Sequence, residues 1–255
     1  MAVWDNPDVD LLYEINGLAK EAPTWADHTM EYVGEYGIVF GLVLLGLWAW
    51  WRITRRRETR DEAVAGFAGL MWAPLAAAVA LLVNIPIRGF VERPRPFFDH
   101  HGLEVLIAGK SDYSFVSDHS TLAMALAVGI FMVNRKFGLI GIVLAVAAGF
   151  SRVYMGVHYP TDVIGGLALG TAVSLLLAPA AMWLLTPVVR AVAGSPRVGA
   201  LVWAGAKGGA GDAGAGAEAA ASADGRRGGQ DGPGVDAAAE PGTRRGRGRD
   251  RDLAA

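Results

Sequence analysis

The short polar segments of this otherwise apolar chain carry arginine and histidine side chains, which are able to bind an anion and to transfer protons. Arg88, Arg95 and Arg152 supply guanidinium groups, whose planar forks pair with phosphate oxygens in a bidentate manner. His119 and His158 add acid–base or nucleophilic capacity near neutral pH. We therefore expect these residues to form one site for an anionic ligand.

The spacing of two further polar groups supports this expectation. His158 and Asp162 are four residues apart, so a helix or turn would bring the carboxylate to the imidazole and fix its tautomer. Ser117, Asp118 and His119 directly precede an apolar run, which is typical of a helix N-terminus, and its N–H groups bind anions. Each residue also has a structural interpretation, since Asp162 could cap the next helix and His119 could be an ordinary interfacial histidine.

The elements that must position these residues are membrane helices. The chain has 255 residues, of which 53% are hydrophobic and only 19% charged, a composition unusual for a soluble protein. A bilayer core of about 30 Å requires roughly 20 residues from each spanning helix. The third and fourth of the apolar stretches fall short, and we expect them to extend through polar residues that face the bundle interior. The predicted stretches are 34–51, 66–86, 120–134, 137–150 and 163–189.

Basic residues predict the orientation of this bundle. Arginine and lysine gather after the first stretch at 52–60, after the third at Arg135 and Lys136, and after the fifth at Arg190 and Arg197. By the positive-inside rule these connections are cytoplasmic. The connections 88–119 and 151–162, which carry the candidate site, are then on the extracytoplasmic face of a cell membrane.

The two ends of the chain differ from the bundle in composition. Leu11, Leu12, Ile15 and Leu18 recur at helical spacing, so 9–19 is predicted to be an amphipathic helix at the membrane interface or packed between helices. Residues 201–255 are Gly- and Ala-rich and are predicted to be a disordered cytoplasmic tail. The expected divisions are therefore 1–33 (N-terminal segment), 34–200 (membrane domain) and 201–255 (tail).

Composition also excludes some functions. The chain has no cysteine, so disulfides, thiolate zinc sites and cysteine nucleophiles are excluded. A net charge of −2 gives no support to nucleic-acid binding.

Read with their gaps, the polar segments form three motifs. They resemble the K-x6-RP, PSGH and SR-x5-H-x3-D signature of the type-2 phosphatidate phosphatase superfamily. The third motif matches without substitution, whereas Arg88 replaces the usual lysine, and Val116 and Asp118 replace Pro and Gly in the second. The serine-aspartate-histidine variant and the run 156–162 are similar to undecaprenyl-diphosphate phosphatases of the bacitracin-resistance type. The motifs are Arg88-x6-Arg95-Pro96, Val116-Ser117-Asp118-His119 and Ser151-Arg152-x5-His158-x3-Asp162.

The resemblance implies a role for each catalytic residue. His158 corresponds to the nucleophile that forms a phosphohistidine, and Asp162 to the residue that orients it. His119 corresponds to the general acid that protonates the leaving oxygen.

The resemblance also implies how the phosphate is held. The substrate phosphate would be bound by Arg88, Arg95, Ser117, Asp118 and Arg152. Asp118 and His119, the last two positions of the second motif, would contribute their backbone N–H groups. No metal or other cofactor is required, because arginines supply the positive charge. A diphosphate substrate needs a further cation for its second phosphate, and Arg93 and Lys110 are the candidates on the same connection.

The sequence thus predicts an all-α membrane bundle of about five transmembrane helices that hydrolyses undecaprenyl diphosphate to undecaprenyl phosphate and phosphate. One alternative is a phosphatidate or phosphatidylglycerophosphate phosphatase of the same mechanism. Another is a non-catalytic protein that binds or flips lipid phosphates. Such a protein would need arginines but no nucleophile, so the histidines favour an enzyme. In each case the expected partners are a lipid phosphate and the bilayer.

Overall fold

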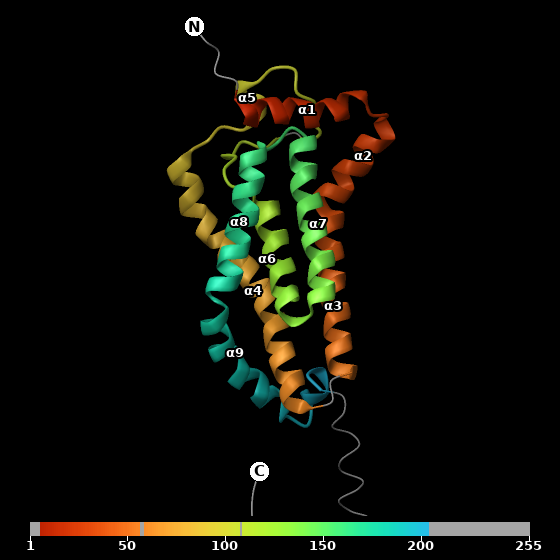
Figure 1. Cartoon of the computed structure of the whole chain (residues 1–255), viewed down its shortest axis with the longest axis vertical. Coiled ribbons are helices and arrows are strands. Elements are labelled where there is room, and N and C mark those ends of the chain that lie inside the picture. The colour runs from red at the N-terminus through yellow and green to blue at the C-terminus, as the bar shows by residue number, and fades with distance from the viewer. Residues whose placement is uncertain (1–5, 57–58, 108, 204–255) are drawn as a thin grey trace, which may run out of the picture. The chain divides into compact units, whose positions relative to one another are not determined.

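Every regular element in the residues that the computed structural model describes, 6–56, 59–107 and 109–203, is a helix, which confirms the predicted all-α fold (Figure 1). A π-helical segment, Val33–Gly37, joins α2 to α3, and a 3-10 turn, Gly199–Leu201, follows α9. The α-helices are α1 (Pro7–Glu21), α2 (Thr24–Tyr32), α3 (Ile38–Arg56), α4 (Arg60–Val91), α5 (Pro96–Asp99), α6 (Asp118–Val133), α7 (Arg135–Tyr154), α8 (Pro160–Leu176) and α9 (Ala178–Ala193).

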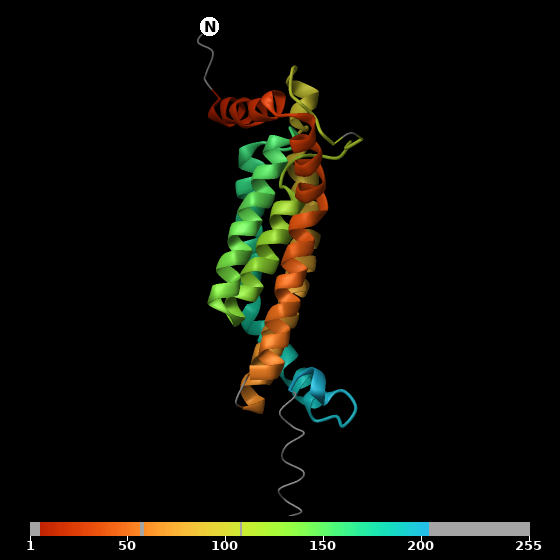
Figure 2. The same ribbon diagram turned by 90° about the vertical axis from the view of Figure 1, so that its right-hand side faces the viewer.

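Helix α6 lies at the centre of the bundle, packed against α4, α7 and α8 (Figures 1 and 2). Glycines allow this close packing. A methyl group on Gly129 of α6 would lie 2.4 Å from the Cβ atom of Ala73 on α4, and one on Gly170 of α8 would lie 2.4 Å from the carbonyl oxygen of Thr121. Small residues at helix contacts are typical of membrane bundles, where packing replaces the hydrophobic drive for association.

The helices correspond to the predicted apolar stretches. By length and composition, three helical segments are candidates to cross a membrane: Thr24–Arg55, Arg60–Asp99 (α4 with α5) and Arg135–Tyr154. The bent pair of α8 and α9 forms a fourth candidate, while α6 is a shorter apolar helix. The fourth stretch extends as predicted through inward-facing polar residues, whereas the third does not reach the length of a span, because α6 has only 16 residues. Helix α6 begins at Asp118 with Ser120 buried, and α7 continues through buried Ser151 and Arg152.

Two details differ from the prediction. The first span begins at Thr24, so the expected boundary after residue 33 falls within a continuous helix. The fifth stretch bends by 53° between α8 and α9. Pro179, in the first turn of α9, lacks the N–H that a continuous helix would need there, which accounts for the position of the break.

Helix α1 lies across the ends of α7 and α8 (Figures 1 and 2). It contains the predicted helix 9–19 and is packed, because Leu12 and Asn16 are fully buried. The Asn16 amide donates to the carbonyl oxygens of Glu104 and Tyr154, both at 2.8 Å. Helix α1 therefore fastens the connection 100–117 to the end of α7.

The opposite end of the bundle carries the end of α3, the start of α4 and the turn between α6 and α7, and with them Arg52, Arg60, Arg135 and Lys136. Of the predicted tail, Val202 is buried against Val64 and Val189. Residues 204–255 lie outside the described part of the chain.

Candidate active site

The predicted site residues come from segments far apart in the sequence that meet at the end of the bundle covered by α1. Arg88 lies in the last turn of α4, and Asp118 and His119 begin α6. Arg152 lies in the last turn of α7, and Asp162 in the first turn of α8. Arg95, Ser117 and His158 lie on the connections between these helices.

Asp162 is fully buried and is held by hydrogen bonds from three sides. Its Oδ2 atom accepts from the Ser114 hydroxyl at 2.5 Å and from the Tyr159 N–H at 2.9 Å, and its Oδ1 atom accepts from Arg93 at 2.9 Å. The bond from Tyr159 caps α8, which confirms the structural interpretation of Asp162. A buried carboxylate needs partners of this kind to offset its loss of hydration.

His158 lies in the buried turn between α7 and α8 with its two nitrogens in different surroundings. Its Nδ1 atom is 3.6 Å from Asp162 Oδ2, and its Nε2 atom is 3.3 Å from Arg95 Nη1. Burial lowers the pKa of His158 below its ordinary value, helped by the charges of Arg95 and Arg152, although Asp162 acts in the opposite direction. A neutral imidazole with Nδ1 toward the carboxylate leaves Nε2 as the atom suited to nucleophilic attack.

Gly156 shapes the turn that presents His158. Its φ of 69° lies in the left-handed region, and a methyl group there would lie 2.8 Å from the Glu104 carbonyl oxygen. Arg95 then donates to the Val157 carbonyl oxygen at 2.9 Å. The turn is thus fixed by backbone conformation on one side and by a guanidinium on the other.

Asp112, which the sequence did not single out, holds the two arginines of the first motif together. Its carboxylate accepts from Arg95 at 2.8 Å and from Arg88 at 3.0 Å. Burial alone would raise the pKa of Asp112, but the charge and hydrogen bond of Arg95, with the charge of Arg88, lower it below its ordinary value. The carboxylate therefore aligns two guanidinium groups that would otherwise repel each other.

The two motif departures at Arg88 and Asp118 meet in space. The Arg88 guanidinium forms an ion pair with the Asp118 carboxylate, which also accepts from the Asn84 amide at 2.7 Å. Asn84 is buried on α4 and donates as well to the Val116 carbonyl oxygen at 3.0 Å. This ion pair explains why an acidic residue, Asp118, is compatible with a site for an anion: its charge is balanced by Arg88, the arginine that replaces the usual lysine.

Arg93, a candidate for binding a second phosphate, is engaged by neighbouring acids. Besides Asp162, its guanidinium donates to Asp8 of α1 at 2.6 Å and to Thr161 at 2.7 Å. It also lies over the Tyr159 ring, 3.6 Å from the centroid. These contacts link α1 to α8 and hold the Asp162 carboxylate in position.

Glu35 is the acidic residue closest to the predicted phosphate-binding arginine on α7. Its Oε2 atom accepts from Arg152 Nη1 at 2.5 Å, and its Oε1 atom is 3.5 Å from Lys110 Nζ and 3.7 Å from His119 Nε2. Gly34 permits this approach, since a methyl group there would lie 2.8 Å from the Ser151 hydroxyl. Glu35 lies in the π-helical segment, a form of helix often found at functional sites.

One nitrogen of the Arg152 guanidinium is still able to donate to a ligand. Its side chain is only 1% exposed, and its Nη2 atom has no hydrogen-bond partner within the described residues. An unsatisfied buried donor is costly and indicates a missing acceptor. The oxygen of a bound anion would satisfy it.

Ser117, another predicted phosphate ligand, makes contacts within the protein at the start of α6. Its N–H donates to the Asp162 carbonyl oxygen at 3.1 Å, and its hydroxyl accepts from the Ser120 hydroxyl at 3.1 Å. Ser117 therefore caps α6 and ties it to α8. The N–H groups of Asp118 and His119, in the first turn of α6, have no acceptor within the helix.

Glu35, Asn84 and Asp112 contact predicted site residues but were not themselves predicted from the sequence. Glu35 and Asn84 are polar residues inside apolar spans, which is a general indicator of function in membrane proteins. Asp112 lies in an irregular connection, where nothing distinguishes it from other polar loop residues.

Comparison with known proteins gives consistent matches. A model of the PAP2 superfamily matches residues 69–185. The undecaprenyl-diphosphatase BcrC of Bacillus subtilis is 33% identical over 168 residues, which cover 66% of this chain and 80% of BcrC. The decaprenylphosphoryl-5-phosphoribose phosphatase of Mycobacterium tuberculosis is 37% identical over 149 residues, covering 58% of this chain and 75% of that protein.

A solved structure supports the fold. The crystal structure of Aquifex aeolicus LpxE superimposes with a TM-score of 0.52 at 20% identity, covering 70% of this chain and 99% of that one. The likeness at this identity concerns the arrangement of helices.

The contact between Glu35 and Arg152 predicts a measurable competition. Because the Glu35 carboxylate occupies the guanidinium that an anion would need, Glu35→Gln should bind inorganic phosphate more tightly, by about tenfold. Isothermal titration of the detergent-solubilised protein measures this affinity. Glu31→Gln, at an exposed residue of α2, is the matched control and should leave it unchanged. Equal or weaker phosphate binding by a folded Glu35→Gln protein would contradict the assignment.

Proposed function

Because the chain belongs to the PAP2 superfamily, we propose that this membrane phosphatase hydrolyses undecaprenyl diphosphate to undecaprenyl phosphate and inorganic phosphate. The similarity to BcrC over four fifths of that protein's length supports this choice of substrate. The observation that carries the chemistry is the arrangement of His158 between the Asp162 carboxylate and the arginine cluster.

In the proposed mechanism His158 is the nucleophile. Its Nε2 atom attacks the terminal phosphorus and forms a P–N bond while the bond from phosphorus to the bridging oxygen breaks. Asp162 orients the ring and stabilises the positive charge that develops on it. His119 protonates the departing oxygen, and undecaprenyl phosphate leaves.

The second half of the reaction regenerates the enzyme. His119, now neutral, removes a proton from a water molecule whose oxygen attacks the phosphohistidine. The P–N bond breaks, inorganic phosphate is released, and His158 returns to its neutral form. The two histidines thus hold opposite protonation states at each step.

The groups proposed to hold the transferred phosphate are three guanidinium groups and two backbone N–H groups. Arg88, Arg95 and Arg152, with the N–H groups of Asp118 and His119, would stabilise the charge on the equatorial oxygens. Ser117 contributes by capping α6 and so positioning those N–H groups. Arg152 would bind the substrate through its unpartnered Nη2 atom, and through Nη1 as well once the Glu35 carboxylate moves aside.

The second phosphate of the substrate is assigned to Lys110. Its ammonium group is only part-buried and faces Glu35 at the edge of the site. Arg93, by contrast, is already paired with Asp8 and Asp162. We therefore assign Arg93 to positioning Asp162, which makes its removal harmful for every substrate.

A lipid phosphate monoester is the second candidate substrate. The similarity to a decaprenylphosphoryl-5-phosphoribose phosphatase supports a polyprenyl-linked monoester. Glycerolipid monoesters such as phosphatidate and phosphatidylglycerophosphate are also compatible, because the arginines hold the transferred phosphoryl group in the same way. Lys110 is the feature that favours a diphosphate.

The site is proposed to face the extracytoplasmic side of the membrane. The basic residues at the ends of α3 and α6 lie at the opposite end of the bundle, and such residues are typically cytoplasmic. A long isoprenoid tail stays in the bilayer, so its headgroup would reach a site at the interface. The C-terminal tail would then be cytoplasmic.

The substrate assignment predicts a preference in a panel of purified lipid phosphates. In detergent, undecaprenyl diphosphate should release phosphate faster than phosphatidate or phosphatidylglycerophosphate, and Lys110→Ala should reduce this preference by about tenfold, corresponding to one lost charge-assisted contact. Because arginines supply the positive charge, EDTA should leave the rate unchanged, and vanadate should inhibit. Equal or faster hydrolysis of the glycerolipids would reassign the substrate, and loss of activity in EDTA that a divalent ion restores would contradict the metal-free mechanism.

The orientation predicts the behaviour of reporter fusions. A reporter that is active only in the cytoplasm should work when it is fused after Arg197 and fail when it is inserted between Phe97 and Lys110. Activity of the 97–110 insertion, with none at Arg197, would reverse the proposed topology.

A further inference from the structure

An apolar groove leaves the candidate site between α3 and α4, with α6 as its floor. Its first part is a hollow of 600 Å³ whose polar end is formed by Glu35, Asp118 and His119. Away from these residues its walls are aliphatic and aromatic side chains of all three helices. These are Val39, Phe40 and Val43 of α3, Leu81 of α4 and Leu122 of α6.

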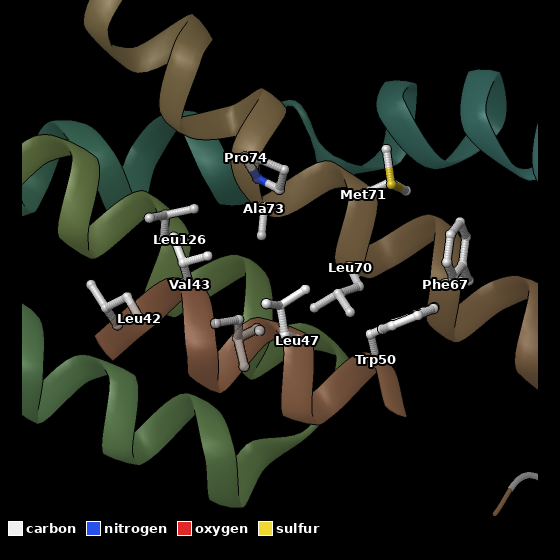
Figure 3. A pocket seen from close by; sticks show the side chains of 12 residues that line it. Leu42, Val43, Leu47, Trp50, Phe67, Leu70, Met71, Ala73, Pro74 and Leu126 are labelled. Atoms are coloured by element: carbon white, nitrogen blue, oxygen red, sulfur yellow. The ribbon is translucent and has the colours of Figure 1, made fainter. Parts of the chain in front are cut away.

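A second hollow of 340 Å³ continues along the same helices (Figure 3). Leu47 and Trp50 of α3 face Phe67 and Leu70 of α4 across it, and Leu126 of α6 lies behind. The one polar atom of the Trp50 side chain is satisfied elsewhere, because its indole N–H donates to the Leu201 carbonyl oxygen at 2.9 Å. The lining therefore offers no partner to a polar ligand.

The two hollows adjoin, since Val43 lines both. From Glu35 to Trp50 the groove follows α3 for about 22 Å at 1.5 Å per residue. A bilayer core is about 30 Å thick, so the groove covers most of its depth. Phe40 and Leu47 are 62% and 52% exposed, so the groove is open along its side to the surroundings.

We propose that this groove binds the first isoprene units of the substrate's tail while the diphosphate occupies the catalytic site. The inference rests on the proposed function. Its support is that candidate-site residues form the polar end of the groove, so a ligand with a charged head and a single long apolar chain fits both parts at once. An extended chain with no polar groups also matches the second hollow, whose lining side chains offer no free donor or acceptor.

Two glycines of α3 allow a matched test. A methyl group on Gly46, which lines the second hollow, would have Ile130 Cδ1 at 3.8 Å as its nearest neighbour, so a larger side chain there is able to enter the groove. A methyl group on Gly41 would have no atom within 4 Å, and Gly41 lines neither hollow. Gly46→Phe should therefore fill the groove, whereas Gly41→Phe should not.

The experiment compares a long and a short substrate in phospholipid nanodiscs. For Gly46→Phe, kcat/KM should fall about tenfold with undecaprenyl diphosphate, since apolar tail surface stays unburied. With geranyl diphosphate, whose tail ends before Gly46, kcat/KM should stay unchanged. Gly41→Phe should match the wild type with both substrates. Val43→Phe, at the junction of the hollows, is a second blocking variant that should lower kcat/KM with both substrates, and more strongly with undecaprenyl diphosphate.

Other outcomes would overturn the inference in distinguishable ways. If both blocking variants keep full activity with undecaprenyl diphosphate, or lose activity equally with both substrates, the groove does not bind the tail. An equal loss accompanied by a changed oligomeric state would identify it as a contact between proteins. If the wild type hydrolyses neither prenyl diphosphate but does hydrolyse a glycerolipid phosphate, the proposed function itself is wrong.

Discussion

The site depends on one buried carboxylate, that of Asp162. It accepts hydrogen bonds from Ser114 on the long connection, from the backbone at the start of α8 and from Arg93, and it lies beside His158. Through Arg93 and Asp8 the same network reaches α1. Because a buried carboxylate without partners is strongly unfavourable, the segments that supply them must assemble together. The requirement that stabilises this end of the bundle also positions His158, the proposed nucleophile.

The rest of the site is a set of arginines held in place by acids. Asp112 aligns Arg88 and Arg95, while Glu35 contacts Arg152. These pairings offset the positive charge of the arginines, although the Nη2 atom of Arg152 has no partner within the described residues, and they also mean that a phosphate has to compete with a carboxylate. A phosphate offers more charge and more acceptor oxygens than one carboxylate. The arrangement therefore favours ligands with a terminal phosphate over those with a single negative charge.

Much of this was predictable from sequence because it depends on local patterns. Apolar length indicated the spans, and the spacing of His158 and Asp162 placed them at one turn. The partners that complete the site were not predictable, since Glu35 meets Arg152, and Asp118 meets Arg88, only through the packing of distant helices. The bend between α8 and α9 was missed because hydropathy is insensitive to a proline inside an apolar run. That Arg88 and Asp118 pair with each other became evident only in three dimensions.

The central claim is that Asp162 holds His158 as a nucleophile, and trapping the phosphoenzyme tests it most directly. Undecaprenyl diphosphate labelled in its terminal phosphate would be mixed with enzyme and quenched rapidly in alkali, where a phosphohistidine survives. We expect the label on His158, no label in His158→Ala, and slower labelling in Asp162→Asn at equal folded protein. An enzyme that turns over without labelling His158, or that remains active as His158→Ala, would contradict the account.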